Sequence, residues 1–301
     1  MGNYKRQWSE YEILECIGEG LQGKVYLAND KKKKIRVALK IPKTSNKDEA
    51  FPSEHVDALV HEIRILTSLN HPHIVQLQGV LCKRTAEHTH VASVLEYAEN
   101  GDLYDIIANT GPLSEDHIRI YFKQLMSALQ ACQDQGIAHR DIKLENLLLD
   151  KNYNLKLCDF GLAKSTTQRF RDREGTRSYM APEVLDSFPY DGKPADLWSA
   201  GVALFVMGLG YPPLREATED DWWFNNLLHG QYDRFWAGHG SHTTKSREFI
   251  DLISQLLSVN PVQRPTISEI MAHPWMLQKP EGVQDLKSHM RNRRMKSAAM
   301  A

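Results

Sequence analysis

The pattern of apolar residues changes character once along this 301-residue chain, close to residue 100. From Tyr11 to Tyr97, short runs rich in β-branched and aromatic residues alternate with polar segments, which predicts a small, mostly antiparallel sheet. One helical pattern interrupts these runs at 56–69. After Gly101 the patterns are longer and helical. The sequence therefore predicts an α+β fold with a small sheet-based lobe and a mainly helical second lobe.

Capping residues and prolines place the helices of the second lobe. Ser114 is an N-cap candidate, with His117 rather than glutamate at the third helical position. Further helices are predicted at 194–208, 246–258 and 266–272, with proline at several of their boundaries.

Composition argues against several classes of protein. The chain has 37 Lys and Arg against 38 Asp and Glu, so no overall charge favours a nucleic acid or a membrane surface as partner. Four widely spaced cysteines without a CxxC pair fit a reducing compartment, and we expect a cytoplasmic or nuclear protein. No signal peptide is evident, and no segment reaches the roughly 18 uninterrupted apolar residues of a membrane span.

A glycine-rich stretch, Gly18-Glu19-Gly20-Leu21-Gln22-Gly23-Lys24-Val25, lies between two strand-like runs. Glycines let backbone amides approach phosphate oxygens without a side-chain clash, although GxGxxG alone is a weak signal. A dinucleotide-binding fold needs this motif to open a helix, whereas here the chain continues as a strand. The stretch therefore predicts a hairpin that covers phosphates.

The next strand-like run, Val37-Ala38-Leu39-Lys40-Ile41, alternates in type. Because strand side chains alternate between faces, Lys40 shares a face with the small Ala38. Glu62 lies at the edge of the apolar stripe of the predicted 56–69 helix and is a candidate to orient Lys40. An exposed lysine on an edge strand is the alternative interpretation.

The segment His139-Arg140-Asp141-Ile142-Lys143-Leu144-Glu145-Asn146 is followed thirteen residues later by Asp159-Phe160-Gly161. Two acids, a lysine and an amide at these intervals can position a hydroxyl group and hold magnesium against ATP phosphates. Cys158 precedes this second acid and either packs as a small apolar residue or faces the nucleotide.

These motifs, in this order and with Ala181-Pro182-Glu183, resemble those of the protein kinase superfamily over residues 11–277. The resemblance implies a bilobal kinase fold, with an N-lobe at 11–97, a C-lobe at 98–277, an N-terminal extension at 1–10 and a basic tail at 278–301. It implies ATP and Mg²⁺ as cofactors, proteins as substrates, and no nucleic-acid or membrane partner. The chain carries no indication of its oligomeric state.

The same resemblance assigns the site residues. Asp141 would orient the substrate hydroxyl, Lys143 would steady the transferring phosphoryl group, and Asn146 and Asp159 would bind the metal. Lys40, oriented by Glu62, would contact the α and β phosphates. The remaining nucleotide-binding residues would be Gly18, Gly20, Gly23, Val25, Ala38, Glu96, Ala98 and Leu148. Leu95 falls at the gatekeeper position, and the residues stacked between the lobes would be Leu66, Leu77, His139 and Phe160.

Lys143 and the Gly175-Thr176 pair resemble serine/threonine kinases. The ending at 267–275, with His273-Pro274-Trp275, resembles most the calcium/calmodulin-dependent and energy-sensing group. Asp172 occupies the place where many relatives carry a regulatory phosphothreonine. A carboxylate there could pair with Arg140 and give partial activity without phosphorylation. Candidate sites for an upstream kinase are Ser165, Thr166 and Thr167.

For several other residues we expect a role in the structure of the C-lobe or in substrate preference. Glu183 with Arg264 resembles a buried ion pair of the C-lobe, and Asp196 matches the start of the central helix. Asp102 and Glu145 suggest a mild preference for arginine upstream of the phosphoacceptor. The basic tail reads as a solvated helix end or linker, with binding to nucleic acid or membrane as an alternative. A non-enzymatic scaffold with a kinase fold is the main rival interpretation.

Overall fold

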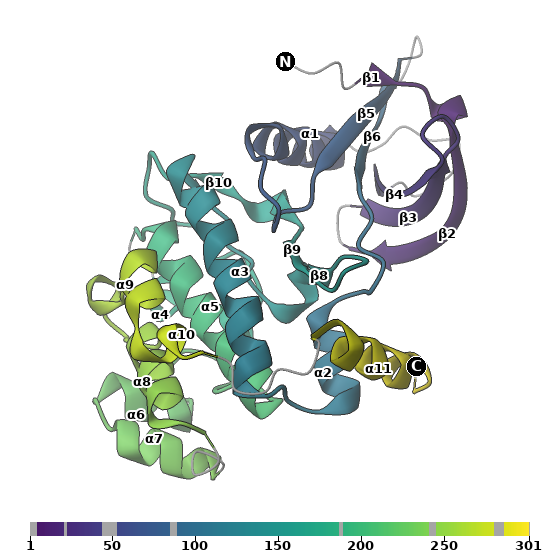
Figure 1. Cartoon of the computed structure of the whole chain (residues 1–301). Helices are drawn as coiled ribbons and strands as arrows, with labels where there is room; N and C mark the ends of the chain where they lie inside the picture. The colour runs from purple at the N-terminus through teal and green to yellow at the C-terminus, as the bar shows by residue number, and fades with distance from the viewer. Residues whose placement is uncertain are drawn as a thin grey trace.

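Two lobes make up the part of the chain that the computed structural model describes, which is residues 5–20, 23–43, 53–84, 89–186, 189–240, 245–279 and 286–300. The smaller lobe holds a sheet and one long helix, and the larger lobe is mainly helical (Figure 1). The α+β, two-lobe prediction is confirmed. Residues 1–4 of the expected extension, 21–22 of the glycine-rich loop, and 280–285 and 301 of the expected tail lie outside the described residues.

The sheet of the small lobe has six strands in the order β1-β5-β6-β4-β3-β2. Their bounds are β1 (Lys5–Arg6), β2 (Tyr11–Glu19), β3 (Gly23–Asp30), β4 (Ile35–Pro42), β5 (Leu77–Arg84) and β6 (Thr89–Glu96). All neighbouring pairs are antiparallel except β1 with β5. On β4, Val37 and Leu39 join a small apolar cluster, whereas Ala38 joins the main core on the other face. The predicted alternation is therefore correct and turns Lys40 toward the second lobe.

Helix α1 (Ser53–Ser68) is the long helix of the small lobe. Leu59 and Leu66 are buried on its inward side, and Glu62 between them is only 2% exposed. The predicted helix at 56–69 is confirmed, with a start three residues earlier. Its inward carboxylate is buried because a cation meets it, as described below.

The larger lobe is built around α3 (Glu115–Asp134) and α5 (Gly192–Leu209), which cross its centre (Figure 1). The other helices are α2 (Leu103–Thr110), α4 (Pro182–Leu185), α6 (Trp222–Leu228), α7 (Tyr232–His239), α8 (Arg247–Leu256), α9 (Ile267–Ala272), α10 (Pro274–Leu277) and α11 (Leu286–Ala298). Short strands β7 (Ile137–Ala138), β8 (Leu147–Leu149), β9 (Leu155–Leu157) and β10 (Lys164–Ser165) lie toward the small lobe. The predicted helices at 194–208, 246–258 and 266–272 correspond to α5, α8 and α9.

Side-chain caps explain where several of these helices begin. The Ser114 side chain accepts from the His117 N–H at the start of α3, as predicted. Thr266 and Glu269 form a reciprocal capping box at the start of α9. Such caps satisfy the free N–H groups of the first turn, so the chain switches into helix at defined residues.

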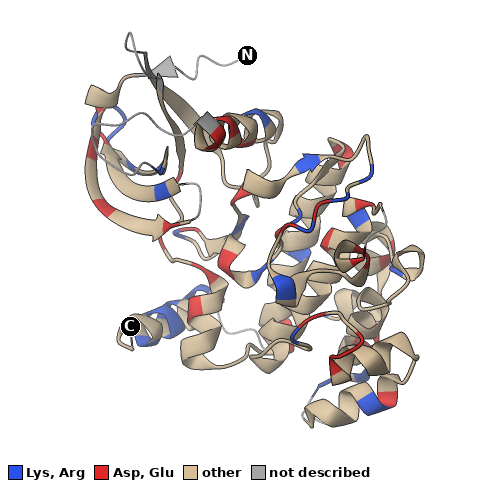
Figure 2. Ribbon diagram, turned by 180° about the vertical axis from the view of Figure 1, so that it is seen from behind, with Lys and Arg blue, Asp and Glu red and all other residues tan. Residues whose placement is uncertain are grey.

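The C-terminal helix α11 packs against α2, with its basic residues seen beside the C-terminus in Figure 2. Met290 is fully buried, and the Arg293 guanidinium donates to the Gly111 and Pro112 carbonyls at the end of α2. A cation at a helix C-terminus is favourable because the last carbonyls lack helical partners. The expectation of a solvated helix end or linker is therefore wrong for residues 286–298. None of the helices in the described ranges combines the length and apolar character needed to cross a bilayer.

Candidate active site

Three charged side chains from three separate elements converge between the lobes. The Lys40 ammonium on β4 lies 2.8 Å from Glu62 Oε2 on α1 and 2.7 Å from Asp159 Oδ1. Asp159 directly precedes the short 3₁₀ helix Phe160–Leu162, and the Glu62 and Lys40 side chains are 3% and 17% exposed. The structure therefore brings these predicted residues together, and Lys40 is not an isolated lysine on an edge strand.

The charges of Lys40 and Asp159 stabilise each other, whereas burial raises the pKa of the Glu62 carboxyl although Lys40 acts in the opposite direction. Burial disfavours the ammonium, but the carboxylates of Glu62 and Asp159 outweigh it and raise the pKa of Lys40. Burial also acts against the charged form of Asp159, yet the Lys40 ammonium lowers the pKa of this carboxyl below its ordinary value. Lys40 and Asp159 are therefore both ionised near neutral pH, as groups that handle phosphate and metal need to be.

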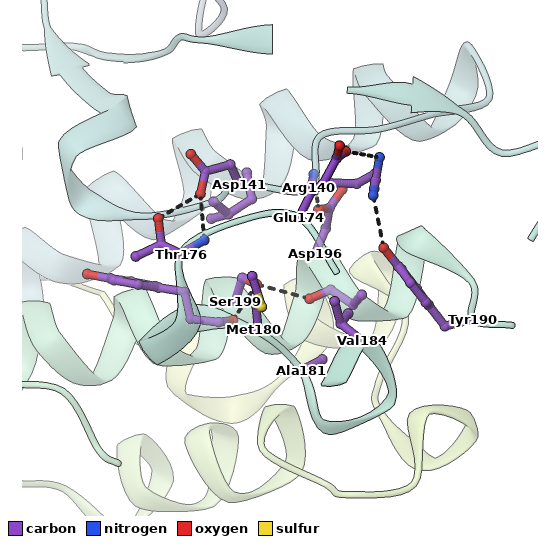
Figure 3. A pocket seen from close by; sticks show the side chains of 13 residues that line it. Arg140, Asp141, Glu174, Thr176, Met180, Ala181, Val184, Tyr190, Asp196 and Ser199 are labelled. Carbon is purple, nitrogen blue, oxygen red and sulfur yellow. Dashed lines mark hydrogen bonds and ion pairs between the residues drawn. The ribbon is translucent and has the colours of Figure 1, made fainter. Parts of the chain in front are cut away.

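Asp141 is the centre of a second cluster on the large lobe. Its Oδ2 lies 2.9 Å from Lys143 Nζ and accepts from Asn146 Nδ2 at 3.1 Å. Its Oδ1 accepts from the N–H and the hydroxyl of Thr176, at 3.1 and 2.9 Å (Figure 3). The carboxylate is thus held in one orientation from both sides, and Lys143 Nζ also donates to Thr176 Oγ1 at 2.9 Å.

Asn146 and Asp159 are the predicted ligands of a divalent metal, and their contacts show which of their oxygen atoms are available to bind one. The Asn146 Nδ2 donates to the Asp141 carbonyl and carboxylate, which fixes the amide so that its Oδ1 is the remaining acceptor. The Asp159 side chain is 49% exposed despite its bond to Lys40. Carboxylate and amide oxygens are ligands that Mg²⁺ prefers, and Mg²⁺ usually completes its shell with water and phosphate. Within the described ranges, there is no cluster of three or more His, Cys, Asp or Glu that could hold a metal, and the metal-binding role of Asn146 and Asp159 remains a prediction.

The predicted hairpin is present in the described residues of the glycine-rich stretch, where β2 pairs with β3 up to Glu19 opposite Lys24. The Gly20 N–H donates to the Gly23 carbonyl at 2.9 Å. A Cβ atom on Gly23 would come within 2.6 Å of the Ile41 carbonyl oxygen, so only glycine fits this position without a shift. Gly18 lies beside Val25. The chain thus continues from β2 into strand β3, without the helix that a dinucleotide motif requires.

Most of the residues expected to contact the nucleotide base are apolar. Ala38 and the gatekeeper candidate Leu95 pair across β4 and β6, and Val25 and Leu148 are half-buried against the same core. Ala98 is buried after β6. The Glu96 N–H donates to the Gln76 carbonyl at 2.9 Å. These apolar positions are buried or half-buried, and their nucleotide-binding roles remain predictions.

The residues expected to stack between the lobes are all buried. The His139 and Phe160 rings meet edge to face with centroids 4.7 Å apart, and Leu66 and Leu77 belong to the same core cluster. Cys158 is half-buried against this core, and burial raises the pKa of its thiol well above the ordinary value. The thiol therefore stays protonated and behaves as a packing group.

The loop that carries Asp141 is anchored from below by Asp196 on α5. The Asp196 carboxylate accepts the backbone N–H groups of His139 and Arg140, each at 2.7 Å. Burial raises the pKa of Asp196 to about 7, against the lowering effect of these two bonds. Arg140 and Asp159 both have positive φ, at 69° and 59°, a conformation that costs about 1–3 kcal/mol and needs such an anchor.

Arg140 is the hub of the segment between Asp159 and Glu183. Its guanidinium lies 2.7 Å from Asp172 and 3.4 Å from Glu174, and donates to the Tyr190 hydroxyl at 3.1 Å (Figure 3 shows Arg140, Glu174 and Tyr190). The Phe170 ring lies 4.7 Å from the same guanidinium. Asp172 Oδ2 also lies 2.5 Å from Lys164 Nζ. The expected pairing of Asp172 with Arg140 is therefore present.

Two buried contacts near the site were missed from the sequence. Lys156 on β9 is 7% exposed and lies 2.6 Å from Glu96, which links the strand before Asp159 to the connection between the lobes. The His61 imidazole on α1 lies 2.7 Å from the Ala163 carbonyl. Period-2 alternation on β9 gives a weak signal for Lys156, whereas nothing local to His61 indicates its partner 102 residues away.

Comparison with known proteins was made on the whole chain. The family model described as "Protein kinase domain" matches residues 11–276. The chain is 36% identical over 278 residues to CBL-interacting serine/threonine-protein kinase 3 of Arabidopsis thaliana, covering 90% of this chain and 59% of that protein. It is 39% identical over 271 residues to putative sperm motility kinase W of Mus musculus, covering 89% and 50%. It is 39% identical over 272 residues to serine/threonine-protein kinase SAPK7 of Oryza sativa subsp. japonica, covering 89% and 72%. The chain thus spans between half and three fifths of the length of the first two.

Proposed function

The chain belongs to the protein kinase family, and from this premise we propose that it transfers the γ-phosphoryl group of ATP to serine and threonine hydroxyls of protein substrates. The observation that carries the proposal is the double contact of Lys40, at 2.8 Å from Glu62 and 2.7 Å from Asp159. Residues from both lobes meet there around one point, with Asp141 held nearby. A cleft so equipped suits phosphoryl transfer, which depends on positioned cations and one oriented carboxylate.

Each of the site residues would have a separate role in the phosphoryl transfer. Asp141 would accept a hydrogen bond from the acceptor hydroxyl and take its proton, since it is the carboxylate oriented by Thr176 and Lys143. Lys143 would neutralise charge on the transferring group. Lys40 would hold the α and β phosphates while Glu62 keeps it in place. Asn146 and Asp159 would hold Mg²⁺, which when bound supplies positive charge against the phosphate oxygens.

A scaffold protein with a kinase fold is the rival, and the intact geometry argues against it. Lys40, Asp141, Asn146 and Asp159 are all present and oriented by neighbours. The test is transfer of radiolabelled phosphate from ATP to a degenerate peptide library with Ser, Thr or Tyr as acceptor. We expect label on Ser and Thr peptides in the presence of Mg²⁺. Nucleotide binding without label on any peptide would support the scaffold instead.

The same proposal includes expectations about domain limits, localisation, phosphorylation sites and substrate preference. We propose the domain limits 11–277, with lobes meeting near residue 98, and a flanking N-terminal extension and basic tail. We place the protein in the cytoplasm or nucleus, consistent with four cysteines that are all free thiols. An upstream kinase could act on Ser165 or Thr167, whose side chains are exposed, or on the half-buried Thr166. A mild preference for upstream arginine at Asp102 and Glu145 also remains a proposal.

Asp172 would give partial activity without phosphorylation. Its carboxylate is held by Lys164 and Arg140, which lower its pKa although burial acts in the opposite direction. A lowered pKa means that its contribution is complete above about pH 4, the ordinary carboxyl value, and is lost only on acidification below it. We expect Asp172→Ala to lower kcat about fivefold, which corresponds to roughly 1 kcal/mol for a partly exposed ion pair.

The measurement is kcat on one Ser peptide before and after treatment of the enzyme with phosphatase. Wild-type enzyme should keep its activity after treatment, and Asp172→Glu should stay close to wild type because the charge is retained. An exposed acid elsewhere, changed in Asp134→Ala, serves as the matched control. Loss of wild-type activity on phosphatase treatment would contradict the role of Asp172.

A further inference from the structure

Alternate residues of the segment after β10 face opposite directions. Phe170, Asp172 and Glu174 turn inward to the Arg140 guanidinium. Arg169, Arg171 and Arg173, here called the arginine row, lie between them in the sequence and are exposed. Because extended backbone alternates its side chains, the contacts that tie the segment to Arg140 also force the row outward. Figure 2 shows acidic and basic stretches alternating along this segment.

The charged residues of this segment differ in whether they have a charged partner. Residues 164–177 contain five cations and two acids. Both acids are engaged by Arg140 and Lys164, and Arg177 pairs with Glu216 at 3.0 Å. Within the described part of the chain, Arg169 and Arg171 have neither an ion-pair partner nor a hydrogen-bond partner. The outer side of the segment is therefore cationic, although the whole chain has a net charge of −1.

The arginine row lies a few residues before the contact with Asp141, the residue proposed to orient the substrate hydroxyl. Thr176, three residues after Arg173, contacts the Asp141 carboxylate. Extended chain spans about 3.3 Å per residue, so Arg169 lies at most about 23 Å along the chain from Thr176. The same rise sets alternate arginines about 6.6 Å apart, the interval between alternate side chains of an extended peptide. A polypeptide with its acceptor at Asp141 can therefore lay alternate acidic residues along the row.

Resting on the proposed function, we propose that the arginine row is a substrate-docking surface that selects acidic residues at alternate positions within about seven residues of the phosphoacceptor. Arg169 and Arg171 are the specificity-determining side chains, and the partner is an acidic segment of a protein substrate. The row is separate from Asp102 and Glu145, which lie by α2 and η2 (Leu144–Asn146) rather than on this segment. A substrate with basic residues toward α2 and acidic residues toward the row would satisfy both surfaces.

The test compares two Ser peptides that differ only in alternate positions, with Asp and Glu in one and Asn and Gln in the other. Wild-type enzyme should show a KM about 3- to 10-fold lower for the acidic peptide at low salt, as expected for two exposed ion pairs. The difference should shrink in 0.5 M NaCl because the charges are screened. In Arg169→Ala/Arg171→Ala the ratio of the two KM values should approach one.

A control variant, Arg36→Ala/Arg247→Ala, removes two exposed arginines from other surfaces and should keep the wild-type ratio. The charge reversal Arg169→Glu/Arg171→Glu should favour a peptide with lysine at the same positions. Equal KM values for both peptides in active wild-type enzyme would overturn the docking surface and leave the proposed function standing. No transfer to either peptide would instead count against the function. Binding of a single-stranded RNA through the row, without a peptide preference, would overturn the acidic-substrate assignment.

Discussion

Replacing Asp141 with asparagine is expected to lower kcat by about 10²- to 10⁴-fold, the range for loss of a general base. The Asp141 carboxylate is oriented by Thr176 at Oδ1 and by Lys143 and Asn146 at Oδ2. Asparagine keeps the shape and the acceptor for Thr176, but its amide nitrogen cannot take a proton from the substrate. It also places a donor opposite the Lys143 ammonium, which should cost roughly 1–3 kcal/mol of stability.

Two measurements separate these effects. Single-turnover transfer to a Ser peptide reports the chemical step, and calorimetric titration with Mg-ATP reports nucleotide binding. Binding should change little, because Lys40 and Asp159 are untouched. The control Asp134→Asn makes the same chemical change at an exposed position at the end of α3. A kcat for Asp141→Asn within tenfold of wild type, at full nucleotide occupancy, would rule out Asp141 as the base.

The convergence of Lys40, Glu62 and Asp159 follows from local patterns that sequence reasoning handles well. Period-2 alternation fixed the face of Lys40, and helical spacing placed Glu62 inward. Each pattern spans only a few residues, so it can be recognised without knowing which distant residues the segment contacts. The pairing of Glu62 with Lys40 was also inferred from these patterns, whereas the placing of Asp159 beside the same nucleotide came from the family resemblance. The structure brings both carboxylates, of Glu62 and Asp159, within 2.8 Å of the Lys40 ammonium.

The docking of α11 was not predictable in the same way. Its sequence carries several basic residues and little apolar periodicity, so it resembles a solvated helix. Burial is concentrated in Met290 and Ser297, and much of the polar contact comes from Arg293 on the Gly111 and Pro112 carbonyls just after α2. Carbonyl groups are present at every helix end, so the sequence gives no sign of which one a guanidinium will meet. The contact of His61 with Ala163 escaped prediction for the same reason.

Removing the partner of a buried cation should give the largest loss of stability in this chain. The Arg264 side chain is fully buried, and its two terminal nitrogens lie 2.5 and 2.7 Å from the two Glu183 carboxylate oxygens. The same guanidinium donates to the Ser258 and Pro194 carbonyls and lies 5.1 Å from the Trp198 ring. Glu183 lies in the first turn of α4, so this pair fixes the end of the segment that starts at Asp159 to the helices beneath it.

Glu183→Ala leaves that guanidinium buried without its counter-charge. Breaking a buried pair costs about 3–5 kcal/mol, because the remaining charge is desolvated and uncompensated. At about 2–4 °C per kcal/mol for domains of 150–250 residues, Tm should fall by roughly 6–20 °C. Glu219→Ala, an exposed acid in the loop before α6, should shift Tm by less than about 2 °C. The double variant Glu183→Leu/Arg264→Met removes both charges and should recover part of the loss, since an apolar pair leaves no buried charge. Equal Tm values for Glu183→Ala and Glu219→Ala would mean that Arg264 finds other compensation, and the pair would then hold the segment in place without being needed for stability.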